Sequence, residues 1–230
     1  MIFSYFANRH ESLLEVTRKE QREAIESLIE QGSMRNGYYL LLTVAALIVT
    51  PGLLLDNVAV VIGGMILAPL MIPLLSISLS LVSGSLNGLL RSLRILVISV
   101  LLTIIVSATV ATVVSHSYND VVTWIPEEIS PGVYIFIAFC SGVAGAFAWV
   151  KKSLSASTAG VAIAVSLLPP LCATGIGIAQ THFLLVRNGL VLFGANFVGI
   201  CMGGFIVFWL LGFLDSGKTE EKVIEKEKQG

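Results

Sequence analysis

The stretch VVIGGMILAPLMIP, residues 60–73, is almost wholly apolar yet contains two prolines. A close copy, VAIAVSLLPPLCAT, follows 101 positions later at residues 161–174 and again contains two. Proline removes a backbone donor from a helix and frees a carbonyl. Lipid offers no hydrogen bonds, so such backbone is tolerated only where protein or water satisfies it. The pair therefore predicts two broken membrane helices, a pattern typical of a transport site between two repeats.

The shift of 101 positions extends beyond these two stretches. The Pro-Leu pair at 69–70 falls on that at 170–171, and Asn-Gly-Leu at 87–89 falls on Asn-Gly-Leu at 188–190. We interpret this agreement as an internal repeat. If each half holds three spans, an odd number, the second half enters the membrane from the opposite side. The two halves then form an inverted pair.

Composition indicates an integral membrane protein. Of the 230 residues, 55% are hydrophobic and 13% are charged, and the mean hydropathy is +0.88. A soluble domain usually carries about 25% charged residues, and a membrane span needs about 20 apolar residues. Six stretches are candidates: about 38–55, 57–83, 92–115, 132–150, 157–180 and 184–213.

We therefore predict an all-α integral membrane fold of six transmembrane helices, arranged as two inverted three-helix repeats. The repeats cover about 38–115 and 132–213, and the second and fifth helices are broken at proline. Residues 1–37 form a cytoplasmic N-terminal helix, 38–213 the transmembrane domain, and 214–230 a charged cytoplasmic tail, disordered or a frayed helix. Close packing is predicted at the Gly199-x-x-x-Gly203 motif.

Lys and Arg flank alternate ends of the predicted spans, whereas the 116–131 connection has neither. Under the positive-inside rule both termini are cytoplasmic and the protein is a multi-pass protein of the inner membrane. Arg187 is a single exception. The residues that support this orientation are Arg9, Arg18, Lys19, Arg22, Arg35, Arg91, Arg94, Lys151 and Lys152.

The polar segment before the first span predicts a helix over residues 9–31. Asn8 with Glu11, or Ser12 with Glu15, supplies a capping box, and Gly32 ends the helix. Its partial apolar stripe can lie on the membrane, pack on the bundle or pair with other subunits. We favour packing or assembly, because the polar face has few Lys or Arg for a lipid anchor.

The stretch DNVAVVIGGMILAPLM, residues 56–71, resembles the signature of a bacterial and archaeal membrane family known as domain of unknown function 389. GVAIAV at 160–165, followed by LLPPL at 167–171, is similar to the family's second motif. Arg91 and Arg94 stand where members carry a basic turn, and many members have proline where this chain has Asn57-Val58. The resemblance covers roughly 38–213 and implies a polytopic bundle in the cytoplasmic membrane, with no established substrate.

No Asp, Glu, Lys, Arg or His lies deep within a predicted span, which argues against a proton pump and against an enzyme. No metal-type spacing and no cofactor motif is present, and Cys140, Cys172 and Cys201 read as small packing residues. The basic residues lack interleaved aromatics, so no nucleic-acid partner is expected.

Neutral groups beside the two breaks remain as candidates for an ion or solute pathway. Carbonyls freed one turn before the prolines could bind a cation, and half-helix N-termini could face an anion. The serines and threonine can instead bond their own helices, Gly63 and Gly64 can serve helix packing, and Asn196 is equally suited to joining helices. The predicted pathway residues are Gly63, Gly64, Pro69, Pro73, Ser76, Ser166, Pro169, Pro170, Thr174 and Asn196.

Asp56 and Asn57 stand at the outer junction of the first two spans. Asp56 could bind a cation at an entrance or cap the second helix together with Asn57, and we favour the cap. The expected function is a small transporter or channel for an ion or small polar solute, working as a homo-oligomer in the lipid bilayer. The alternatives are a non-transporting scaffold or signalling subunit acting through the N-terminal helix and, more weakly, a lipid-handling protein.

Overall fold

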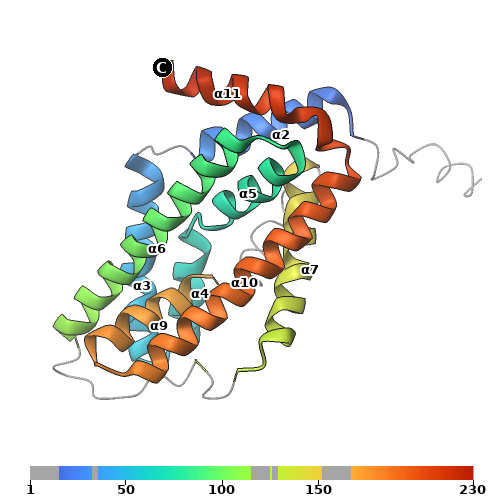
Figure 1. The fold of residues 1–230 in the computed structure, drawn as a ribbon. Coiled ribbons are helices and arrows are strands. Elements are labelled where there is room, and N and C mark those ends of the chain that lie inside the picture. The colour runs from blue at the N-terminus through green and yellow to red at the C-terminus, as the bar shows by residue number, and fades with distance from the viewer. Residues whose placement is uncertain (1–15, 33–35, 115–124, 126–128, 152–166, 230) are drawn as a thin grey trace, which may run out of the picture.

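The structure, a computed structural model, describes residues 16–32, 36–114, 125, 129–151 and 167–229. Within these ranges every regular element is a helix, and no strand occurs. Figure 1 shows the elements in chain order: α2 (Arg18–Gln31), α3 (Asn36–Leu54), α4 (Val58–Leu67), α5 (Met71–Ser83), α6 (Leu86–Val114), α7 (Pro131–Val150), α9 (Leu168–Ala179), α10 (Phe183–Leu210), the 3-10 helix η2 (Phe213–Ser216) and α11 (Gly217–Gln229).

Four described helices, α3, α6, α7 and α10, are long and apolar enough to cross a membrane. The α4–α5 pair forms a fifth such element, bent by 49° at its break. The predicted all-helical membrane protein is therefore confirmed, and so is the break in the second span. The six-span count and the inverted repeat stay predictions, because residues 157–166 of the predicted fifth span lie outside the described residues.

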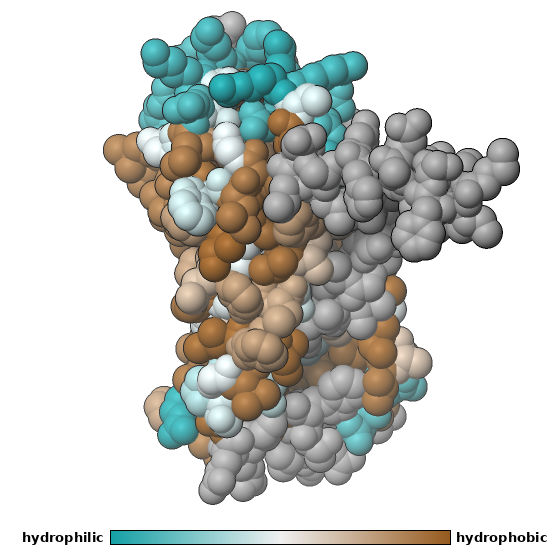
Figure 2. All heavy atoms as spheres, turned by 90° about the vertical axis from the view of Figure 1, so that its right-hand side faces the viewer, coloured by the Kyte–Doolittle hydropathy of each residue, from teal (hydrophilic) through white to brown (hydrophobic). Residues whose placement is uncertain are grey.

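Polar and apolar surfaces are separated along the bundle. α2 and α11 lie side by side across one end (Figure 1). Figure 2 shows hydrophilic side chains gathered at that end and hydrophobic ones covering the middle of the face. The exposed apolar side chains belong largely to the long helices, for example Leu101, Ile105, Phe136 and Trp209. Such a band suits contact with lipid.

The N-terminal helix is shorter in the described region than the predicted 9–31. α2 begins at Arg18, because Thr17 has extended backbone and forms a capping box with Glu20. The Thr17 side chain accepts from the Glu20 amide, and the Glu20 carboxylate accepts from the Thr17 amide at 2.7 Å. The prediction of a helix that continues through Thr17 is therefore wrong. The capping box of Thr17 and Glu20 was not predicted, and the two boxes that were predicted lie outside the described residues. The predicted end at Gly32 agrees with the structure.

α2 packs on the bundle through its apolar stripe. Ile25, Leu28 and Ile29 are buried in a cluster that also contains residues of α5, α7, α10 and α11. Polar contacts reinforce this packing: the Arg91 guanidinium of α6 donates to the carbonyls of Ile29 and Gly32 at the end of α2. Of the three locations considered for this apolar stripe, the structure therefore shows the second, in which the stripe packs on the bundle.

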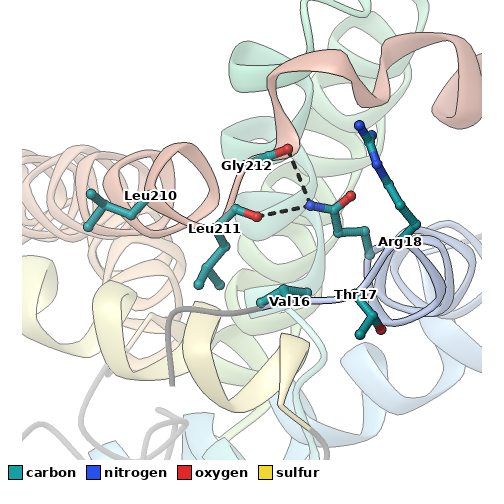
Figure 3. A pocket seen from close by; sticks show the side chains of 7 residues that line it. Val16, Thr17, Arg18, Leu210, Leu211 and Gly212 are labelled. Atoms are coloured by element: carbon teal, nitrogen blue, oxygen red, sulfur yellow. Dashed lines mark hydrogen bonds between the residues drawn. The ribbon is translucent and has the colours of Figure 1, made fainter. Parts of the chain in front are cut away.

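Gln21 joins α2 to the end of α10. Its Nε2 donates to the carbonyl oxygens of Leu211 at 2.9 Å and Gly212 at 3.2 Å (Figure 3). These carbonyls lie just past the C-terminus of α10, where no intrahelical donor is available. A cavity of about 400 Å³ opens beside this contact, lined by Val16, Thr17, Arg18, Gln21, Leu210, Leu211 and Gly212.

Glycines bring α7 and α10 into close contact. A Cβ on Gly199 would lie 2.5 Å from the carbonyl of Ile135, and one on Gly203 would meet the Phe139 carbonyl. Gly142 of α7 lies equally close to Ile200 of α10. The Gly199-x-x-x-Gly203 motif therefore serves helix packing, as predicted.

The charged C-terminal stretch differs from the expected disordered or frayed tail. Residues 217–229 form α11, which packs against α2, α5 and α6. Ile224 and Glu220 of this helix are buried, at 3% exposure each. A stretch rich in Lys and Glu looks solvated in the sequence, whereas here one face of it is covered by the bundle.

Candidate functional site

The candidate site lies around two short helices inside the bundle, α5 and α9. Each packs against both α6 and α10. α10 meets α9 at Gly189, which lies against Thr174 and Pro170, and it meets α5 at Gly204, which lies against Ser78. Fifteen residues separate the two glycines, about 22 Å along a helix. The two short helices therefore occupy successive levels between the same pair of long helices.

The break between α4 and α5 leaves the expected carbonyls, but both have partners. One turn before Pro69, the carbonyl of Met65 accepts from the Ala68 amide at 3.2 Å. One turn before Pro73, the carbonyl of Pro69 accepts from the Ile72 amide, also at 3.2 Å. Short i→i−3 bonds thus replace those that proline removes. A cation at these oxygens would have to use their second lone pairs.

Of the four prolines predicted for the site, Pro69 lies in the turn between α4 and α5, and the other three stand at helix starts. Pro73 is the third residue of α5, and Pro169 and Pro170 are the second and third residues of α9. The first-turn amides of a helix lack intrahelical acceptors, so proline there leaves fewer orphan donors. Two prolines at the buried start of α9 lower the cost of beginning a helix inside the bundle. They also leave few amides at that end to face an anion.

Apolar side chains fill the described surroundings of the two helix starts. Leu70, Leu74, Leu168 and Leu171 are each at most 2% exposed and belong to one buried cluster. Both short helices are buried along most of their length. In this conformation the described residues therefore pack tightly around the starts of α5 and α9.

Two hydroxyls from the predicted site have different environments. Thr174 of α9 is 1% exposed and donates to the carbonyl of Pro170 at 2.8 Å, bonding its own helix. Ser76 of α5 lies one turn after Pro73 and is 6% exposed, and its Oγ has no hydrogen-bond partner among the described residues. An unpaired buried hydroxyl is unfavourable. The Tyr39 hydroxyl is likewise unpaired among the described residues, so of the described hydroxyls in the predicted site Ser76 is the one best able to take a further ligand.

Asn196 lies on α10 between the contacts with α9 and with α5, and it is 6% exposed. It makes an interaction within the protein. Gly64 is buried against α3, where an added Cβ would lie 2.6 Å from Val49 Cγ2. Gly63 is exposed, and nothing described lies within 4 Å of an added Cβ there. Ser166 lies outside the described residues.

Asn57 is the N-cap of α4, since its side chain accepts from the Val60 amide at 3.2 Å. Asp56 is exposed and has a φ of 50°, in the left-handed region. His182 caps α10 by accepting from the Leu185 amide. Asn57 thus caps α4, and Asp56 makes an interaction of its own within the protein.

A row of polar contacts between α3 and α6 was not predicted. The hydroxyls of Tyr38 and Ser99 lie 3.1 Å apart, and Thr50 Oγ1 donates to Ser107 Oγ at 2.8 Å. On α6 the buried Ser92, Ser99, Thr103 and Ser107 recur every four or seven residues, which places them on one face. That spacing was available in the sequence as a signal.

Comparison with known proteins adds a family but no activity. A family model described as "Domain of unknown function (DUF389)" matches residues 65–202. The uncharacterized protein MJ0678 of Methanocaldococcus jannaschii is 27% identical over 207 residues, which make up 86% of this chain and 64% of that protein. The chain thus spans less than two thirds of that relative. No solved structure matches the chain.

Proposed function

The chain belongs to the membrane-protein family of domain of unknown function 389, and from this premise we propose that it is a small transporter or channel for an ion or small polar solute. The observation that carries the proposal is the pair of short helices, α5 and α9, which start at prolines in the interior of an apolar bundle. Interrupted helices are costly in lipid and mark binding sites in transporters. The residues at the level of these breaks are neutral, so the pathway relies on backbone, hydroxyl and amide groups.

The inverted repeat is part of this proposal. Gly88 and Gly189 are equivalent under the shift of 101 positions, and in each half this glycine lies against the preceding short helix, at Ser80 of α5 or at Thr174 of α9. α2 and α11 also lie at the same end of the bundle (Figure 1). Both observations support six spans with both termini on the cytoplasmic side of the inner membrane. We further propose a homo-oligomer, because the spanning region is small for an alternating-access carrier.

Flux through proteoliposomes tests the proposal. Potassium and chloride currents and glycerol permeation are measured for the wild type, Pro69→Ala and Pro170→Ala. Pro131→Ala is the matched control, because Pro131 starts α7 at an exposed position away from the breaks. We expect flux of at least one probe, lost in the first two variants and kept in the third. Unchanged flux in both break variants, with normal insertion, would rule out a pathway at the breaks.

The alternative is a scaffold or signalling subunit that acts through the N-terminal helix. It is disfavoured because the apolar stripe of α2 is used within the bundle. Substitution of exposed α2 residues, Arg22→Ala with Glu26→Ala, separates the two functions without disturbing that packing. A transporter keeps its flux in this variant, whereas a scaffold loses its partner.

A further inference from the structure

Glu220 is a buried acid on a helix that otherwise looks solvated. It is 3% exposed, while its neighbours Glu221 and Lys222 are exposed. Its Oε1 lies 2.5 Å from Ser80 Oγ and its Oε2 lies 2.5 Å from Ser83 Oγ, in the last turn of α5. The side chain therefore attaches α11 to the cytoplasmic end of the interrupted span.

The seat of Glu220 is shaped for a carboxyl group. A Cβ on Gly88, in the first turn of α6, would collide with both Glu220 Oε1 and Ser80 Oγ. Only glycine at this position leaves room for the acid between α5 and α6. The absence of a side chain at Gly88 thus creates the space that Glu220 fills.

The surroundings of Glu220 both oppose and favour its negative charge. In the part of the chain that the structure describes, Glu220 forms no ion pair within 4 Å, and its carboxyl contacts the hydroxyls of Ser80 and Ser83. It lies at the C-terminus of α5, the negative end of that helix dipole, and in the first turn of α11, the positive end of its own. Arg91 of α6 acts on it from a distance while donating to carbonyls of α2, and Glu221 of α11 opposes that effect. Burial is the largest influence and raises the pKa of Glu220.

The number of hydrogen-bond donors around Glu220 favours its neutral, protonated form. Ser80 Oγ lies 2.5 Å from Glu220 Oε1 and 2.8 Å from the carbonyl of Ser76. A hydroxyl has one proton and can donate to only one of these acceptors. With Glu220 protonated, Oε1–H donates to Ser80, Ser80 donates to Ser76, and Ser83 donates to Oε2. Each proton then has one acceptor.

We propose that Glu220 is a proton-binding site that fastens α11 to α5, so that α11 docks when this carboxyl is neutral and is released when it ionises. The direction of this pH dependence follows from the coupling between proton binding and docking. The docked state binds the additional proton between the ordinary pKa of a glutamate and the raised pKa in the seat, so docking weakens as pH rises through the raised pKa. A single site changes the docking constant by up to about tenfold per pH unit in that window.

Electron–electron double resonance, which measures the distance between two spin labels, tests this proposal independently of transport when the protein is held in nanodiscs. Spin labels are placed at Lys226→Cys on α11 and Leu90→Cys on α6, both exposed, in a Cys140→Ala background whose other cysteines are buried. From about pH 5 to about pH 9, the wild-type distance distribution is expected to pass from narrow to broad. Glu220→Gln keeps the narrow distribution at every pH, and Glu221→Gln, the matched control, follows the wild type.

Two results would overturn the proposal: a wild-type distribution that does not change with pH, or a Glu220→Gln variant that changes as the wild type does. If Glu220→Gln fails to fold, the Ser83→Ala variant tests the proposal instead. This variant removes a hydrogen bond that favours the ionised form, so the midpoint of release moves to higher pH. A midpoint that stays in place or falls contradicts the proposal.

Discussion

Lys151 Nζ at the end of α7 lies 3.1 Å from Glu20 Oε1 in the first turn of α2, although 131 residues separate the two in the chain. The Lys151 side chain is only 10% exposed, and that of Glu20 is 36% exposed. The pair therefore joins the N-terminal helix to a membrane span at a place where water only partly screens the charges.

Glu20→Gln should destabilise the protein by about 1 to 3 kcal/mol, because it removes the negative charge that pairs with a largely buried ammonium. Glu26→Gln is the control, since Glu26 pairs with Arg22 at 2.8 Å on an exposed surface. Its cost should stay below about 1 kcal/mol. Unfolding in detergent by a thermal melt measures both variants. Equal losses would mean that the burial of Lys151 is not important.

The benefit from Glu20 should vanish in acid. The Thr17 amide, and next the Lys151 ammonium, lower the pKa of Glu20 from its ordinary value of 4.5. An acid with a lowered pKa in the folded state contributes stability above its ordinary pKa, and this is lost as pH falls through the lowered one. The stability difference between wild type and Glu20→Gln should therefore shrink below about pH 4.5. A difference that is constant with pH would contradict this assignment.

Adjacent glycines in α4 should behave differently. In Gly64→Ala the new methyl would lie 2.6 Å from Val49 Cγ2 and 3.1 Å from Ile48 Cγ2, so α3 and α4 must separate. We expect a loss of about 1 to 3 kcal/mol. Gly63→Ala meets nothing described within 4 Å and should leave stability unchanged. If Gly63→Ala nevertheless lowers flux, its effect is on the pathway and not on packing.

Ser76→Ala should separate stability from transport. Its hydroxyl is buried without a described partner, so its removal should raise stability by up to about 1 kcal/mol. If Ser76 is a ligand of the transported species, flux should fall at the same time. Ser78→Ala is the control, because Ser78 Oγ lies within hydrogen-bond distance of the carbonyls of Leu74 and Cys201, 2.9 Å and 3.2 Å away, and can donate to either. It should lose about 1 kcal/mol and keep its flux. A Ser76→Ala protein with full flux would remove Ser76 from the site.

Local chemistry explains what could be predicted. A proline removes a backbone donor from a helix, so a break near Pro69 could be predicted from the sequence, although Pro51 lies inside α3 without interrupting it. The positions of the other prolines within their helices could not be predicted in this way. Pro73, Pro169 and Pro170 lie in the first turns of short helices instead of kinking long ones. A helix start depends on which neighbours can satisfy its backbone, and these neighbours are distant in sequence.

Glu220 marks the limit of prediction from sequence. In α11 it is one acid among several Lys and Glu residues, and such a pattern normally describes a solvated helix. Its burial depends on Gly88 and Ser83, more than a hundred residues earlier, which together form its seat.

The membrane class, the family and the interrupted second span can be read from the sequence, because hydropathy and proline act within a few residues. The three-dimensional arrangement is needed to know which carbonyls near Pro69 have partners, that Ser76 has none among the described residues, and that the Glu220 side chain of α11 is buried against the bundle. Burial and hydrogen bonding are properties of pairs of groups brought together by folding, and one-dimensional periodicity does not contain those pairings.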